Sequence, residues 1–169
     1  MGGQSGMSVK GDDASSDPDV SFAAVVISHA RLSRQISEYV AQKATDTNVK
    51  KLAQDISTDQ QEVSTKVQDA AKKEGITLQT DRMLPRDQAT LDFLKQLPTA
   101  SLERMYLFQL AGTNQTHQLM AQWAAKNAKS PEMKQAAQDL ATKLEQRGAT
   151  IDKLAQAQIN NPSPTAGER

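Results

Sequence analysis

The chain has 169 residues, no cysteine, and 20 basic side chains against 20 acidic ones, so its net charge is zero. A neutral chain with only 4% aromatic residues lacks the basic patches and stacking rings that nucleic-acid binding requires. Disulfides, thiolate nucleophiles and thiolate-bound metals are excluded, and no apolar run is long enough for a transmembrane helix.

Residues 1–17 are small and polar, and we expect them to form a disordered N-terminal tether. The run from Gly2 to Gly6 resembles the flexible segment that follows the lipidated cysteine of bacterial lipoproteins. Met1 would then stand where that cysteine was, with a lipid anchor upstream of residue 2. The alternative is a cytoplasmic protein whose first residues come from cloning.

Residues 18–75 are predicted to form a first helical hairpin, because their apolar residues recur at steps of three and four. The first helix begins at Asp17-Pro18, a capping acid followed by proline, and runs to about Ala44. The second helix ends just before Gly75, a residue suited to the left-handed position after a helix.

Residues 76–98 are predicted to connect the two hairpins, with a short helix over 87–97. A second hairpin over 99–158 follows, and its last helix begins at Ser130-Pro131. We expect residues 159–169 to form a disordered tail.

An internal repeat relates the two hairpins. The triplet Ala53-Gln54-Asp55 recurs as Ala137-Gln138-Asp139, an offset of 84 residues (137 − 53). Two related hairpins joined by one long connection predict an all-α fold. We expect an antiparallel four-helix bundle of the ferritin-like type, with a short extra helix in the crossover connection.

A di-iron centre is disfavoured by the sequence. Ferritin-like enzymes place Glu-x-x-His on two of their helices, and this pattern does not occur here. The two histidines, His29 and His117, are preceded at the third position by Val26 and Asn114.

Three segments resemble the family called domain of unknown function 4142: SEYVAQKATDTNVKKLAQDISTDQQEV, SLERMYLFQLAGTNQTHQLM and SPEMKQAAQDLATKLEQR. The resemblance covers about residues 17–154. It implies a ferritin-like bundle, usually bacterial and exported, with acidic and histidine positions suited to a metal.

At those metal-suited positions this chain departs from the family pattern. By register, Ser33 takes the place of a glutamate, Gln60 and Asn114 take the places of histidines, and Arg147 falls near another histidine. Two acids of the pattern are retained, at Asp59 and Glu103. The resemblance therefore implies a degenerate metal site, with no cofactor.

Three interpretations of these positions remain open. The first is a polar layer in the core whose side chains hydrogen-bond one another. The second is a pocket for a small anionic or polar ligand, in which Arg147 is the anchor and His117 and Asn114 are hydrogen-bond donors. The third is a metal held by His29 and His117. The polar layer or ligand pocket would comprise Ser33, Gln60, Glu103, Asn114, His117 and Arg147.

Two aromatic residues, Phe108 and Trp123, lie off the main apolar stripe of their helix. They are expected either to fill a groove against the short helix or to form an exposed patch for a partner.

We expect a non-enzymatic protein with a binding or structural role, located in the periplasm or at the outer membrane rather than in the cytoplasm. Its partner would be an unidentified protein or cell-envelope component, and not a nucleic acid. The alternative is a ferritin-like metal-binding or oxidative-stress protein.

Overall fold

The computed structural model describes residues 8–9, 17–78 and 83–160. Within these ranges the protein is helical apart from two short strands, so the prediction of an all-α helical bundle is confirmed. None of the described helices is long and apolar enough to cross a membrane. The five helices are α1 (Pro18–Lys43), α2 (Thr47–Lys73), α3 (Pro85–Lys95), α4 (Thr99–Asn127) and α5 (Pro131–Asn160).

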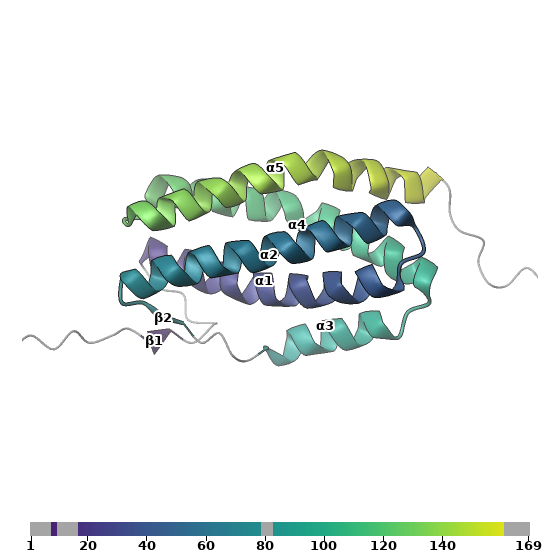
Figure 1. Ribbon diagram of the computed structural model, residues 1–169, viewed down its shortest axis with the longest axis horizontal. Coiled ribbons are helices and arrows are strands. Elements are labelled where there is room, and N and C mark those ends of the chain that lie inside the picture. Colours follow the sequence, from purple (N-terminus) through teal and green to yellow (C-terminus); the bar gives the residue numbers. More distant parts are fainter. Residues whose placement is uncertain (1–7, 10–16, 79–82, 161–169) are drawn as a thin grey trace, which may run out of the picture.

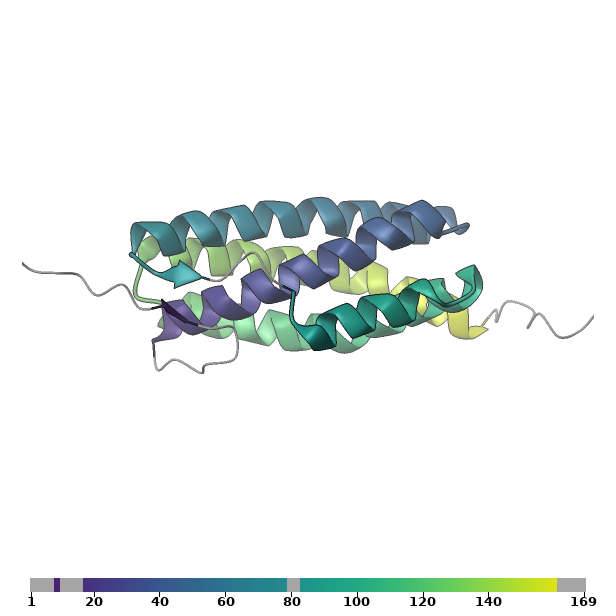
Figure 2. The same ribbon diagram turned by 90° about the horizontal axis from the view of Figure 1, so that it is seen from below.

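The long helices pair as two hairpins. Helix α1 packs along α2, and α4 packs along α5, each pair being joined by a turn of three residues. The hairpins lie against each other through contacts of α2 with α5 and of α1 with α4 (Figures 1 and 2). Helix α3 lies alongside α1 and brings the chain back to the start of α4.

Local signals set where the helices begin. The Asp17 side chain accepts a hydrogen bond from the Asp19 backbone, and Asp46 accepts bonds from the first turn of α2. Proline stands first in α1, α3 and α5, where its missing N–H costs no helical hydrogen bond. Gly75, with φ of +69°, ends α2 in a conformation that disfavours other residues.

A two-stranded pairing was not predicted from the sequence. Strand β1 (Ser8–Val9) pairs in parallel with β2 (Thr77–Leu78). The expected tether thus includes a paired segment; its other residues, 1–7 and 10–16, lie outside the described residues. The expected tail at 161–169 also lies outside them, and α5 continues through Asn160.

The buried apolar side chains form two clusters, one toward each end of the bundle. Phe22 belongs to the first cluster, and Tyr106 belongs to the second. Between them each long helix carries mainly polar residues at mid-height. This polar band, which separates the two apolar clusters, lies between residues 30 and 36 on α1, 56 and 63 on α2, 107 and 121 on α4, and 144 and 151 on α5.

Each hairpin also supplies a buried carboxylate to the turn of the other. Asp19 of α1 accepts hydrogen bonds from the backbone N–H groups of Lys129 (2.8 Å) and Ser130 (2.9 Å). Glu103 of α4 accepts bonds from the N–H groups of Thr45 (2.6 Å) and Asp46 (3.0 Å). The donors and acceptors are all related by the 84-residue offset, so the two hairpins exchange equivalent contacts.

Candidate functional site

The polar band at mid-height contains five of the six residues singled out from the sequence. Ser33 and Gln60 are buried, and the other three are partly buried. They are Ser33, Gln60, Asn114, His117 and Arg147. Glu103 is the exception, because its carboxylate caps the turn between α1 and α2 at one end of the bundle.

These side chains share a level without forming a hydrogen-bonded network. Asn114 Nδ2 donates to the backbone oxygen of Leu144 (3.0 Å), and Arg147 bonds to Asp59. Among the described residues, no direct hydrogen bond joins any two of the six. The sequence-based expectation that they bond one another therefore needs correction. The helices place them at one height, but their partners are other groups.

The two histidines meet between α1 and α4. Their ring centroids are 3.8 Å apart, and the ring planes make an angle of 43°. Burial, and after it the electrostatic effects of His117 and Arg147, together lower the pKa of His29 to about 3. Burial also lowers the pKa of His117. Both rings are therefore neutral at pH 7.

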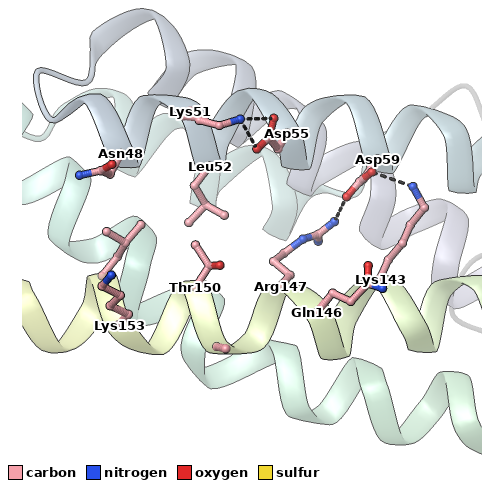
Figure 3. Close-up of a pocket in the computed structure, with 12 residues that line it drawn as sticks. Asn48, Lys51, Leu52, Asp55, Asp59, Lys143, Gln146, Arg147, Thr150 and Lys153 are labelled. Atoms are coloured by element: carbon pink, nitrogen blue, oxygen red, sulfur yellow. Dashed lines mark hydrogen bonds and ion pairs between the residues drawn. The ribbon is translucent and has the colours of Figure 1, made fainter.

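Arg147 reaches from α5 to α2 in the same region (Figure 3). Its side chain is only 9% exposed, and its Nη2 lies 2.5 Å from Asp59 Oδ2. The other oxygen of Asp59 accepts from Lys143 (2.8 Å), which also contacts Glu62 (2.9 Å). Asp59 is thus held between two cations from the opposite hairpin.

A groove of about 680 Å³ opens beside this ion pair, between α2 and α5. Lys51 and Asp55 form an ion pair along its α2 wall (3.1 Å), and Lys153 lies on the α5 side (Figure 3). The charged residues that line the groove are Lys51, Asp55, Asp59, Lys143, Arg147 and Lys153.

Sequence reasoning missed several members of this region. Asp59 and Lys143 are separated by 84 residues, so the repeat itself could have identified them as facing positions. Tyr106 donates to or accepts from Ser37 (2.7 Å) in the core, and burial raises the pKa of its hydroxyl. No pattern of apolar spacing predicts such a pair, because it joins two different helices.

The aromatic residues Phe108 and Trp123 lie on the outer face of α4. They are 41% and 48% exposed, and Met105 (42%) and Leu119 (60%) are exposed on the same helix. From Met105 to Ala125 the sequence contains no Asp, Glu, Lys or Arg. Helical spacing brings the four exposed side chains to one side of α4, which forms an uncharged apolar face.

The residues present fit a metal ion poorly. In the part of the chain that the structure describes, no group of three or more His, Asp or Glu side chains is arranged to hold one. The positive charge of the Arg147 guanidinium acts on the His29 imidazole, and it opposes a second cation there. The carboxylate of Asp59, which lines the groove, is already paired with Arg147 and Lys143.

The buried histidine predicts a loss of stability in acid. The folded protein holds the pKa of His29 near 3, whereas an unfolded chain has a value near 6.5, so only the unfolded state takes up this proton between those pH values. When the pH falls from 7 to 5, the proton uptake by His29 in the unfolded state should therefore lower the free energy of unfolding by about 2 kcal/mol.

Urea unfolding of the wild type and of His29→Leu at both pH values checks this prediction. The wild type should lose about 2 kcal/mol more than the variant between pH 7 and pH 5. Equal losses in the two proteins would mean that His29 takes up its proton in the folded state.

Comparison with known proteins gave one family and one solved structure. A family model described as "Domain of unknown function (DUF4142)" matches residues 4–154. No curated protein matches the chain. The crystal structure of a DUF305 fragment from Deinococcus radiodurans is similar, with 16% sequence identity and a TM-score of 0.72. The alignment covers 86% of this chain and 99% of that fragment, and at this identity it establishes a shared fold alone.

Proposed function

The chain belongs to the DUF4142 family, and from this premise we propose that it is a non-enzymatic binding or structural protein whose metal site has degenerated. We further propose that the fold is an antiparallel four-helix bundle of the ferritin-like type, with α3 in the crossover. The two short turns inside the hairpins and the single long connection between them support this topology.

The pairing of Arg147 with Asp59 carries the proposal. A guanidinium whose side chain is 9% exposed reaches across the groove to a carboxylate of the opposite hairpin. Arg147 lies near the position where the family resemblance led us to expect a histidine. A permanently charged side chain there supplies the positive charge that a metal would otherwise bring, and it holds the hairpins together.

Elemental analysis of untagged protein, purified without chelators, tests the proposal. We expect no stoichiometric iron, zinc or copper, because the Asp59 carboxylate is ion-paired and the charge of Arg147 acts on the His29 imidazole. Metal present at one equivalent, and lost in both His29→Ala and His117→Ala, would overturn it. An exposed Gln42→Ala variant on α1 serves as the control.

A metal-binding or oxidative-stress role is the second candidate, and one observation favours it. His29 and His117 are in ring contact and are both neutral at pH 7, so their lone pairs are available to a metal. The same elemental analysis separates the two candidates.

The apolar outer face of α4 supports a role in binding a protein partner. Exposed aromatic and aliphatic side chains without intervening charge are typical of such surfaces. A photo-reactive amino acid placed at Phe108 should cross-link a defined partner in the source cells, whereas one at Gln54 on α2 should not. Absence of adducts at both positions would remove this support.

We also propose that the protein acts outside the cytoplasm, in the periplasm or at the outer membrane. The resemblance to an exported family supports this location. The gene provides the check: an apolar leader that ends in cysteine is expected upstream, and its absence would count against a lipid tether.

A further inference from the structure

A second recess lies on the other side of α2, facing α1. Its volume is about 150 Å³, which is enough for one small ligand. The groove beside Arg147 lies toward α5, so the two sites are separate. The polar lining consists of Arg31, Arg34, Gln60, Gln61, Ser64 and Gln68, and no acidic side chain contributes to it.

Arg34 is positioned by its neighbours. Its Nη1 donates to the side-chain oxygen of Gln61, and its Nε lies 3.4 Å from Glu38 Oε1. Glu38 stands outside the recess, one helical turn along α1. The guanidinium is thus oriented at the rim before any ligand arrives, which lowers the entropic cost of binding.

Arg31 is the second cation of the recess. Among the described residues its side chain has no ion pair and no hydrogen bond. A guanidinium presents five N–H donors in a planar fork, and their natural partners are the oxygens of carboxylate or phosphate groups. Such a group bound in the recess would pair with Arg31 without displacing any existing contact.

Gln60 provides the independent observation that the recess is a binding site. The residue is only 4% exposed and lines the recess. Its side-chain amide has no hydrogen-bond partner among the described residues. In the described part of the chain, the fully buried side-chain atoms without a hydrogen-bond partner are Arg34 Nε and Arg104 Nε, so the Gln60 amide keeps some contact with solvent. A bound ligand would replace that solvent with a direct partner, and it would also lie beside Arg34 Nε, which lines the same recess.

We propose that this recess binds a small oxyanion of the phosphate type, either free or as the phosphate of an organic ester. Arg31 supplies the main ion pair, Arg34 supplies a second positive charge, and the Gln60 amide and Ser64 hydroxyl donate hydrogen bonds to the remaining oxygens. Gln60 belongs both to the sequence-predicted residues of the central polar band and to this recess, whereas Arg31, Arg34 and Ser64 line only the recess.

Isothermal titration calorimetry in phosphate-free buffer at pH 7 tests the site, with inorganic phosphate and glycerol 3-phosphate as probes. We expect saturable binding of at least one probe at constant ionic strength. Arg31→Gln should weaken it at least about tenfold, because a charge-assisted pair is lost. Arg86→Gln is the matched control, since it removes the same charge from an exposed position on α3.

Gln60→Leu is the second variant, because it removes the amide and retains an apolar side chain for packing. It should also weaken binding severalfold, and circular dichroism should show unchanged helicity. A stronger response to glycerol 3-phosphate would assign the site to an organic ester, and a stronger response to phosphate would assign it to the free ion. No saturable heat with either probe, or equal weakening by Arg31→Gln and Arg86→Gln, would overturn the proposal.

Discussion

Glu103→Ala is expected to lower the free energy of unfolding by about 3 kcal/mol. Glu103 is 5% exposed, and its Oε1 accepts bonds from the backbone N–H groups of Thr45 and Asp46 and from the Thr45 hydroxyl (3.2 Å). The alanine variant loses these charge-assisted bonds and leaves N–H groups of the α1–α2 turn without an acceptor. It also leaves a cavity beside the core.

Urea unfolding at pH 7 measures this loss. Glu103→Gln should cost less, because its side-chain oxygen can still accept the same bonds. Asp19→Ala should resemble Glu103→Ala, since Asp19 caps the turn between α4 and α5 in the same way. Glu145→Ala, at an exposed position on α5, is the control. A change within about 0.5 kcal/mol for Glu103→Ala would show that the cap contributes little.

The second large effect is expected for Arg147→Ala, which should cost about 2 kcal/mol. The variant removes a nearly buried side chain and leaves Asp59 with Lys143 as its remaining cationic partner. Part of the free energy lost with the ion pair is offset, because Asp59 lines the open groove and water can hydrate its freed oxygen.

The pKa of His29 gives Arg147→Ala a second readout. The charge of Arg147 contributes to the low pKa of His29, so the variant should raise that pKa, as followed by NMR titration of the imidazole. Lys153→Ala removes an exposed cation from the same groove and should leave both stability and the imidazole nearly unchanged. A neutral result for Arg147→Ala would contradict the position of its side chain between the hairpins.

The helices were predictable because their signals are local. Asp17-Pro18 and Ser130-Pro131 mark helix starts by capping and by the fixed φ of proline, and α1 and α5 begin there. The short helix begins at Pro85, two residues earlier than predicted, because proline in the first turn needs no donor. The pairing of β1 with β2 could not be predicted, since two-residue strands have no measurable periodicity.

For the candidate site, the sequence predicted the height of most of its residues along the bundle axis, but not the contacts between their side chains. The repeat relates His117 to Ser33, and both lie in the polar band, but the ring that His117 contacts is His29, one turn earlier on α1. The retained acid Glu103 was assigned to the same layer, although it caps a turn at the end of the bundle. Which side chains meet depends on how the hairpins pack, and that is not encoded in the spacing along one helix.

The ion pair between Asp59 and Lys143 has a consequence for the origin of the chain. These positions are equivalent under the 84-residue repeat, so in a symmetric dimer of one ancestral hairpin the residue would have faced its own copy. Two aspartates or two lysines there would repel each other. A single chain that carries both hairpins escapes that constraint, because its two equivalent positions can hold opposite charges that favour pairing of the unlike halves.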